Sequence, residues 1–143
     1  MKIGELARIT NCTPDTIRFY EREGLLPPAG RTEANYRTYD ETHVERLRLI
    51  RNCRELDMTH DEVRALLQAS EANASSCCAI NALVEAHICR VGMRIDELIK
   101  LRDQLNALRK KCRGERAVDS CGIMHELTSR KTPGRKQKKS HLA

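Results

Sequence analysis

Aromatic side chains are scarce in this 143-residue sequence: they make up 3% of the chain, and tryptophan is absent. A hydrophobic core must therefore be built from leucine, isoleucine, valine and alanine, a composition that suits packed helices better than β-sandwiches. The length suits one compact unit with extensions, since domains commonly contain about 100–150 residues. These features predict an all-α fold.

Long apolar runs are also missing. No stretch approaches the roughly 20 apolar residues that would span a bilayer, and the N-terminus shows no export signal. We therefore expect a cytoplasmic protein with no membrane partner.

The chain contains seven cysteines, an odd number that cannot pair completely within one chain, and in a cytoplasmic protein thiols are expected rather than disulfides.

Acidic side chains are absent from residues 129–143, which are expected to form a disordered basic tail that can touch phosphate nonspecifically. The formal charge of the whole chain is +6. This excess favours polyanionic partners, because lysine and arginine release the counterions condensed on nucleic acid. The basic side chains of the tail are Arg130, Lys131, Arg135, Lys136, Lys138 and Lys139.

Two short helices are expected at the N-terminus. The first spans Ile3–Thr10 on an apolar stripe and ends at Asn11. The second has Thr13 as its N-cap and Pro14 at the first helical position, and it ends at Gly24. Helices joined by so short a turn form a helix-turn-helix, whose second helix can enter the major groove of DNA.

A wing and two further helices are expected next. The helical periodicity stops between residues 25 and 39, where prolines and a glycine break regular structure and basic and aromatic residues alternate. A third helix is expected from about Asp40, and a fourth from the capping box formed by Thr59 and Glu62. Together these elements predict a winged helix-turn-helix domain over residues 1–69.

Basic and aromatic side chains on the second helix and in the wing are candidate DNA contacts. Arg18 can contact phosphate or a guanine edge, and Tyr20 can pack its ring while its hydroxyl donates to phosphate. For the helix by itself, the alternative is that Phe19 and Tyr20 belong to the core and the arginines form a solvated face. The second cluster, in the wing, favours DNA. The candidate contacts are Thr16, Arg18, Tyr20, Arg31, Tyr36, Arg37 and Tyr39.

A long helix is expected over residues 79–110, after a linker of small and polar residues at 70–78. Its apolar side chains recur every seven residues with flanking partners, as in a two-helix seam. The alternative is that this helix folds back onto its own domain. We favour an antiparallel coiled-coil homodimer, with a seam made by Val84, Ile88, Val91, Ile95, Leu98, Leu101, Leu105 and Leu108.

Three cysteines flank this helix, and geometry limits how they can share a metal. The helix would be about 50 Å long, at roughly 1.5 Å per residue, so Cys77 and Cys112 lie near its opposite ends. A metal–thiolate bond is only about 2.3 Å, so shared coordination requires the partner's Cys77 to reach Cys112 and Cys121 in an antiparallel dimer. We therefore expect a metal-binding loop and short helix over residues 111–128, and two sites that span the dimer.

Three thiolates without a nearby carboxylate or imidazole suit soft ions such as lead, cadmium and mercury, whereas structural zinc usually takes four ligands. Cys78 could replace its neighbour or supply a fourth thiol. The alternative for each cysteine is a small buried side chain, which we favour for Cys12 and Cys53. His87 is expected to be an ordinary histidine on the helix surface, and the role of Cys89 stays open.

Five segments resemble motifs of MerR-type transcription regulators: residues 3–7 (IGELA), 16–21 (TIRFYE), 24–26 (GLL), 35–39 (NYRTY) and 51–59 (RNCRELDMT). The resemblance covers roughly the first 125 residues. It implies that a homodimer binds a near-palindromic operator in promoter DNA. It also implies that bound metal makes the protein distort this DNA until RNA polymerase can use the promoter. The resemblance adds Arg54 to the candidate DNA contacts.

The cysteines of this sequence match one group within that family. Cys77, Cys112 and Cys121 match the effector cysteines of the branches that respond to cadmium, lead and mercury. Residues 81–88 and 121–123 are similar to the cadmium/lead branch, and the nine-residue step between the loop cysteines resembles lead sensors. The resemblance therefore implies Pb(II) or Cd(II) as effector, with Hg(II) or Zn(II) as alternatives, and metal-resistance or efflux genes as targets.

Other classes of function fit the sequence less well. An iron–sulfur redox sensor needs clustered cysteines, and a thiol enzyme needs a Cys-x-x-Cys pair or a cysteine positioned by histidine and asparagine. Neither arrangement is recognisable. A metal-independent architectural DNA-binding protein would explain the basic charge but leave the cysteines without a role. We expect a regulator rather than an enzyme, and metal-dependent promoter activation distinguishes it from the architectural alternative.

Overall fold

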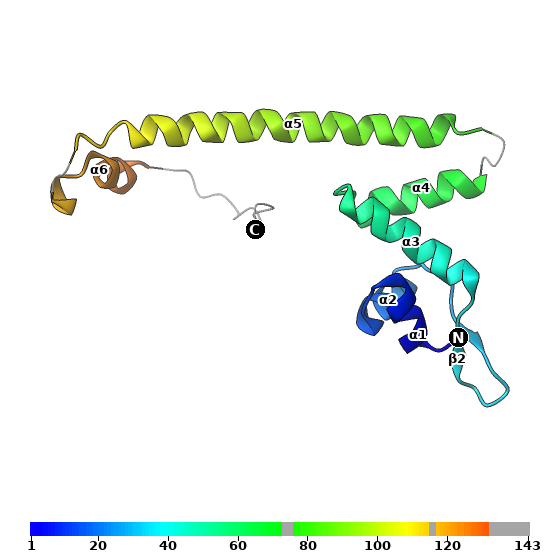
Figure 1. Cartoon of the computed structure of the whole chain (residues 1–143). Coiled ribbons are helices and arrows are strands. Elements are labelled where there is room, and N and C mark those ends of the chain that lie inside the picture. Colours follow the sequence, from blue (N-terminus) through cyan, green and yellow to red (C-terminus); the bar gives the residue numbers. More distant parts are fainter. Residues whose placement is uncertain (73–75, 115–116, 132–143) are drawn as a thin grey trace. The chain divides into compact units, whose positions relative to one another are not determined.

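The structure is a computed structural model that describes residues 1–72, 76–114 and 117–131. Helices dominate it, and a two-stranded sheet forms the wing (Figure 1). The chain divides into two compact units, Met1–Cys89 and a second that begins at Arg90. The predicted all-α fold with a small wing is confirmed. No helix in the described ranges is long and apolar enough to cross a membrane.

The helix-turn-helix consists of α1 (Ile3–Thr10) and α2 (Pro14–Arg22). Asn11 ends α1 in the left-handed conformation, with φ +53°. Thr13 caps α2, because its side-chain oxygen accepts a hydrogen bond from the Thr16 amide at 3.1 Å. Gly24 follows α2 with φ +72°, a conformation that favours glycine. These local signals explain why both helices lie where the sequence predicts them.

The wing pairs β1 (Gly30–Arg31) with β2 (Arg37–Thr38) in antiparallel register, with Gly30 opposite Thr38. At its tip, Asn35 has φ +65° and its amide donates to the Thr32 carbonyl at 2.8 Å. Asparagine tolerates this conformation better than most residues. The turn therefore reverses the chain within a few residues.

Helix α3 (Glu41–Glu55) follows its N-cap residue Asp40, whose carboxylate accepts a hydrogen bond from the Thr42 backbone amide at 3.0 Å. Helix α4 (His60–Ala72) begins with the predicted capping box. The Glu62 amide donates to Thr59 Oγ1 at 3.1 Å, and the Thr59 amide donates to Glu62 Oε1 at 3.2 Å. Both starts confirm the sequence signals.

Helix α4 ends later than expected. Residues 70–72, predicted as the start of a linker, continue this helix. The last turn is held against α3 by an ion pair of 3.2 Å between Glu71 Oε1 and Arg46 Nη2. This contact is not local, so the small and polar sequence of the segment did not reveal it. Residues 73–75 of the predicted linker lie outside the described part of the chain.

A single core joins α1 to α4 and the base of the wing. Its largest fully buried side chains are Leu6, Ile17, Leu25, Leu26, Leu47, Ile50 and Val63. Two arginines add polar links around this core. Arg51 donates to the Thr10 carbonyl at the end of α1 at 2.9 Å, and Arg64 donates to the Glu23 carbonyl after α2 at 3.0 Å. Cations at helix C-termini are favourable, so these contacts stabilise the helix-turn-helix.

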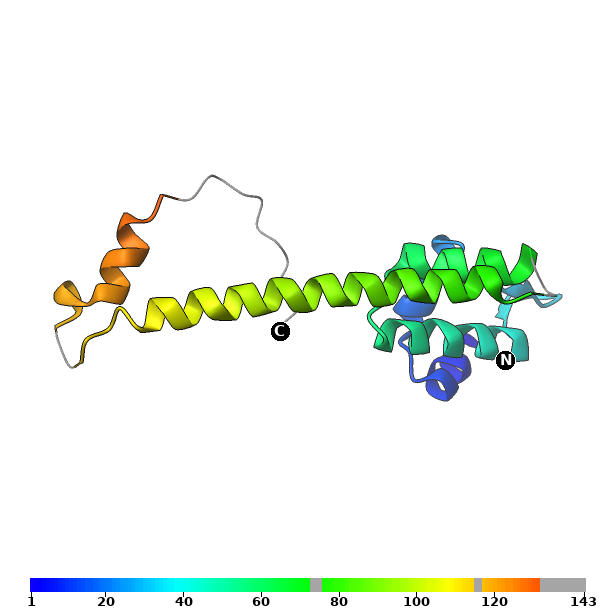
Figure 2. The same cartoon turned by 90° about the horizontal axis from the view of Figure 1, so that it is seen from above.

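Helix α5 (Cys78–Arg109) is continuous over 32 residues and agrees within one residue with the predicted range (Figure 2). A short 3-10 helix, η1 (Val118–Ser120), and helix α6 (Gly122–Ser129) follow it. Helix α6 corresponds to the short helix expected within residues 111–128. Most of the predicted basic tail, residues 132–143, lies outside the described residues.

Candidate nucleic-acid interface and metal centre

Helix α2 presents Arg18 to solvent. Its guanidinium forms an exposed ion pair of 3.1 Å with Asp15, three residues earlier. Exposed pairs of this kind contribute little stability, so a phosphate or base can replace the carboxylate at small cost. Thr16 is half-buried, and its hydroxyl shares a hydrogen bond of 2.8 Å with the hydroxyl of Thr13. Arg18 is therefore the available charged group of this helix among the candidates.

Tyr20 belongs to the core, with 7% of the residue exposed. Its ring centroid lies 5.7 Å from that of Phe19 and 5.8 Å from that of His60. Burial raises the pKa of its hydroxyl. The ring packs as the sequence predicted, and contact of the hydroxyl with phosphate stays a prediction.

Tyr39 is buried, whereas a DNA contact in the wing was expected to be exposed. The residue is 2% exposed, and its hydroxyl donates to Glu21 Oε1 at 2.6 Å. Burial and this hydrogen bond raise the pKa of Tyr39 to about 12. This hydroxyl is engaged within the protein, where it ties the base of the wing to α2, and a direct contact of Tyr39 with DNA stays a prediction.

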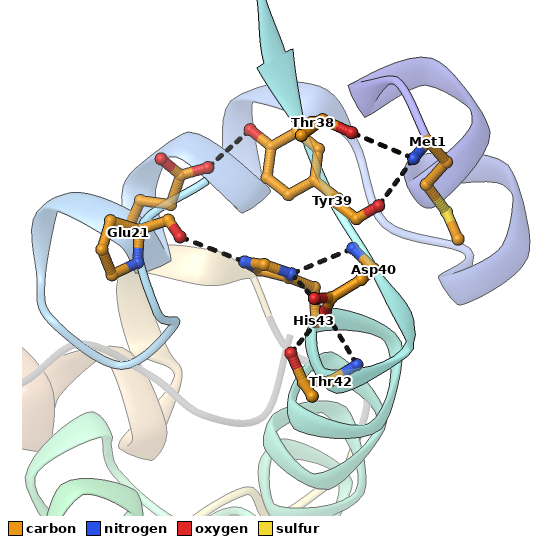
Figure 3. A network of polar contacts seen from close by, with 8 residues as sticks. Met1, Glu21, Thr38, Tyr39, Asp40, Thr42 and His43 are labelled. Carbon is orange, nitrogen blue, oxygen red and sulfur yellow. Dashed lines mark hydrogen bonds and ion pairs between the residues drawn. The ribbon is translucent and has the colours of Figure 1, made fainter. Parts of the chain in front are cut away.

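A network of polar contacts surrounds Tyr39 (Figure 3). The N-terminal ammonium of Met1 donates to the Tyr39 carbonyl at 2.6 Å and to Thr38 Oγ1 at 3.3 Å. On the other side, His43 Nδ1 accepts from the Asp40 amide at 3.1 Å, and Nε2 faces the Pro28 carbonyl at 3.3 Å. The network fixes the direction of the wing. Sequence reasoning missed Met1 and His43, although the position of His43 three residues after Asp40 is a capping-box signal.

The other candidate DNA contacts are exposed. Tyr36, at the wing tip, is 70% exposed, and Arg31 and Arg37 are exposed on the two strands. Arg31 Nη1 also donates to the Asn35 carbonyl at 3.1 Å, which orients its guanidinium along the turn. Arg54 is exposed near the end of α3 and donates to the Met58 carbonyl. Both arginines retain further N–H donors for phosphate.

The second unit brings two of the candidate metal ligands together. Cys112 follows α5 and Cys121 precedes α6, and both line a hollow of about 1280 Å³ between these elements. Cys112 is exposed and Cys121 is half-buried. Over residues 1–72, 76–114 and 117–131, no three histidine, cysteine or acidic side chains lie close enough to hold a metal.

Gly122 closes this hollow by a close backbone approach. A Cβ atom at this position would lie 2.1 Å from the carbonyl oxygen of Lys111 and 3.0 Å from its carbonyl carbon. Only glycine fits so near a backbone group. Because Lys111 precedes Cys112 and Gly122 follows Cys121, this contact holds the two cysteines on neighbouring backbone segments. Sequence reasoning missed it, since the two residues are distant in sequence.

The remaining cysteines differ in exposure. Cys77 lies exposed before α5, Cys78 is the first residue of α5, and Cys89 is exposed within it. Cys12 and Cys53 are half-buried and pack against the core, as predicted. Burial raises the pKa of the Cys53 thiol, which keeps it protonated and poorly nucleophilic.

The predicted seam of α5 is uncovered along the helix. Six of its eight side chains are exposed, by 39% at Val84 to 63% at Ile88, and Leu98 and Leu108 are half-buried. A stripe of large apolar side chains is unusual on the surface of a lone helix. His87 differs from the expectation of a surface residue, because its side chain is only 14% exposed.

Comparisons with known proteins agree with these features. Residues 1–70 match the family described as MerR HTH family regulatory protein, and residues 44–108 match the one described as MerR, DNA binding. A curated relative is the HTH-type transcriptional regulator ZntR homolog of Haemophilus influenzae, 46% identical over 111 residues, which cover 78% of this chain and 82% of the relative.

Two solved structures resemble the fold along most of the chain. One is the transcription regulator PbrR691 from Ralstonia metallidurans CH34 in complex with lead(II), with 46% identity, a TM-score of 0.81, and coverage of 89% of this chain and 98% of that chain. The other is the regulator MerR from Bacillus megaterium MB1 in complex with mercury(II) ion, with 26% identity, a TM-score of 0.74, and coverage of 90% and 99%.

Proposed function

The chain belongs to the MerR family of helix-turn-helix transcription regulators, and from this premise we propose that it is a homodimer that activates a promoter when it binds Pb(II) or Cd(II). It is a regulator and not an enzyme. The observation that carries the proposal is the pair of thiols, Cys112 and Cys121, that line one hollow after a long helix. The target genes are those of metal resistance or efflux.

The third ligand in this proposal is the partner's Cys77. Helix α5 contains 32 residues and is therefore about 48 Å long, with Cys77 before its first turn and Cys112 after its last. An antiparallel pair of such helices places the start of one beside the end of the other. The exposed apolar seam of α5 supports such a pair, because its burial would favour association by about 25 cal/mol per Å².

The donor set fits a soft metal ion. Three thiolates suit lead, cadmium or mercury better than hard cations such as magnesium. The relative of known structure with 46% identity is a complex with lead(II), which favours lead for this chain. Mercury and zinc are the alternatives, since the structure with 26% identity holds mercury(II) and a curated relative is a ZntR homolog.

Activation would work through the shape of the DNA. The helix-turn-helix and wing of each protomer would hold one half of a near-palindromic operator, chiefly through phosphate contacts. Metal binding would then favour a dimer geometry in which the promoter is bent and untwisted, at a cost of several kcal/mol that the backbone contacts offset. RNA polymerase would use the promoter in this distorted form.

Transcription in vitro distinguishes the proposed metal-dependent regulator from a metal-independent architectural DNA-binding protein. Purified protein, its own promoter and RNA polymerase are combined with lead, cadmium, mercury or zinc in separate reactions. We expect transcription to rise with lead or cadmium at the lowest metal concentrations. Promoter binding without any metal-dependent transcription would instead support a metal-independent architectural protein.

Replacing Arg18 with alanine should weaken operator binding by about 1–3 kcal/mol if the side chain reads a base, or lower the salt dependence by about one ion if it contacts phosphate. The exposed ion pair with Asp15 contributes little to folding, so stability should hold. Electrophoretic mobility shifts at two salt concentrations measure both effects. Lys100→Ala removes the same charge on α5 and serves as control. Unchanged affinity in the Arg18 variant would remove this residue from the interface.

Replacing Gly122 with alanine should weaken metal binding by roughly 10- to 100-fold, the effect usual for residues that position ligands. The added methyl group would collide with the Lys111 carbonyl and separate the segments that carry Cys112 and Cys121. Gly4→Ala is the matched control, because nothing lies within 4 Å of a Cβ atom there. Competition with a chromogenic chelator measures both affinities. Equal affinity in the two variants would show that the close approach does not organise the site.

A further inference from the structure

His87 joins the first turns of α5 to the corner between α3 and α4, within the first compact unit. Its Nε2 atom lies 2.8 Å from the carbonyl oxygen of Leu56. Its Nδ1 atom lies 2.8 Å from Oε2 of Glu62, and the two side chains are 14% and 17% exposed. These turns of α5 run beside α4 in both views (Figures 1 and 2).

Both ring nitrogens of His87 face oxygen atoms of the α3–α4 region. Nε2 faces a backbone carbonyl, and Nδ1, which is shielded from solvent, faces a carboxylate. The imidazole ring therefore contacts this region through both of its nitrogens.

We propose that His87 is a positioning residue whose ring fastens helix α5 to the corner between α3 and α4 and so transmits metal binding to the DNA-binding helices. The contact itself is independent of the metal, and the transmission rests on the function proposed above.

Thermal unfolding tests the contact without metal. His87→Gln removes the contact with Glu62 and should lower Tm by about 4 °C or more. The exposed His125→Gln is the control and should leave Tm unchanged. An unchanged Tm in His87→Gln would overturn the contact.

Metal titration and transcription test the transmission in the full-length dimer. His87→Gln should bind lead with wild-type stoichiometry, followed by thiolate-to-metal absorption, while its metal-dependent activation falls by about 2- to 30-fold. Wild-type activation with normal metal binding would overturn the transmission. Absence of metal binding in the wild-type protein would instead overturn the proposed function, and the change in Tm would still decide the contact.

Discussion

Replacing Cys112 or Cys121 with serine should abolish activation by metal and leave operator affinity nearly unchanged. A serine hydroxyl is a poor ligand for lead, cadmium or mercury, so the loss of metal affinity should exceed the roughly 10- to 100-fold typical of residues that only support ligands. The candidate DNA contacts belong to the other compact unit, which explains the intact operator binding. Promoter transcription with increasing metal and mobility shifts without metal measure the two effects.

Cys89→Ser is the matched control for these variants. Cys89 is exposed on α5, and Cys112, which follows this helix, is exposed too. Cys89 lies outside the hollow that contains the candidate ligands. This variant should respond to metal as the wild-type protein does. Retained activation in both the Cys112 and the Cys121 variant would contradict the assigned site, and loss of operator binding in them would show that these cysteines serve the fold.

Replacing Ile95 with aspartate should break the proposed dimer and, with it, tight operator binding. Ile95 is 52% exposed and lies in the apolar seam of α5, so a carboxylate there would be desolvated on association without a partner. Linking two binding modules raises affinity by about 10²- to 10⁴-fold, and a monomer loses this gain. Sedimentation equilibrium and mobility shifts should therefore change together.

Lys100→Gln changes the charge of α5 by the same single unit on the opposite face of the helix, and this variant should remain dimeric. The contrast between the two variants separates the seam from the general charge of the helix. If Ile95→Asp stayed dimeric and bound the operator normally, the seam would have another role, such as folding back onto its own domain.

The elements that could be predicted from the sequence are those with local signals. Thr13 and Pro14 mark the start of α2, and the Thr59–Glu62 capping box marks the start of α4, since each contact joins residues within one helical turn. The seven-residue repeat marks α5 for the same reason. These signals depend only on residues close together in the sequence, so they can be recognised without the tertiary structure.

Contacts between distant residues were not predictable from such signals. The Glu71–Arg46 pair joins the last turn of α4 to α3, the Tyr39 hydroxyl donates to Glu21, and Gly122 approaches the Lys111 carbonyl closely. Each depends on a packing partner that no local pattern names. The candidate metal ligands show the same limit. Three thiols in the sequence predict a soft metal ion, but only the fold places Cys112 and Cys121 at one hollow.

The central claim is that each metal site contains Cys112 and Cys121 from one protomer and the partner's Cys77. Heterodimers of a Cys77→Ser chain and a Cys112→Ser chain, isolated with two affinity tags, test it most directly. In a site that spans the dimer, the heterodimer retains a single complete set of three thiolates, so it should bind lead tightly although both parent homodimers fail. Failure of the heterodimer to bind lead would contradict the shared site, because sites confined to one chain would be incomplete in both chains.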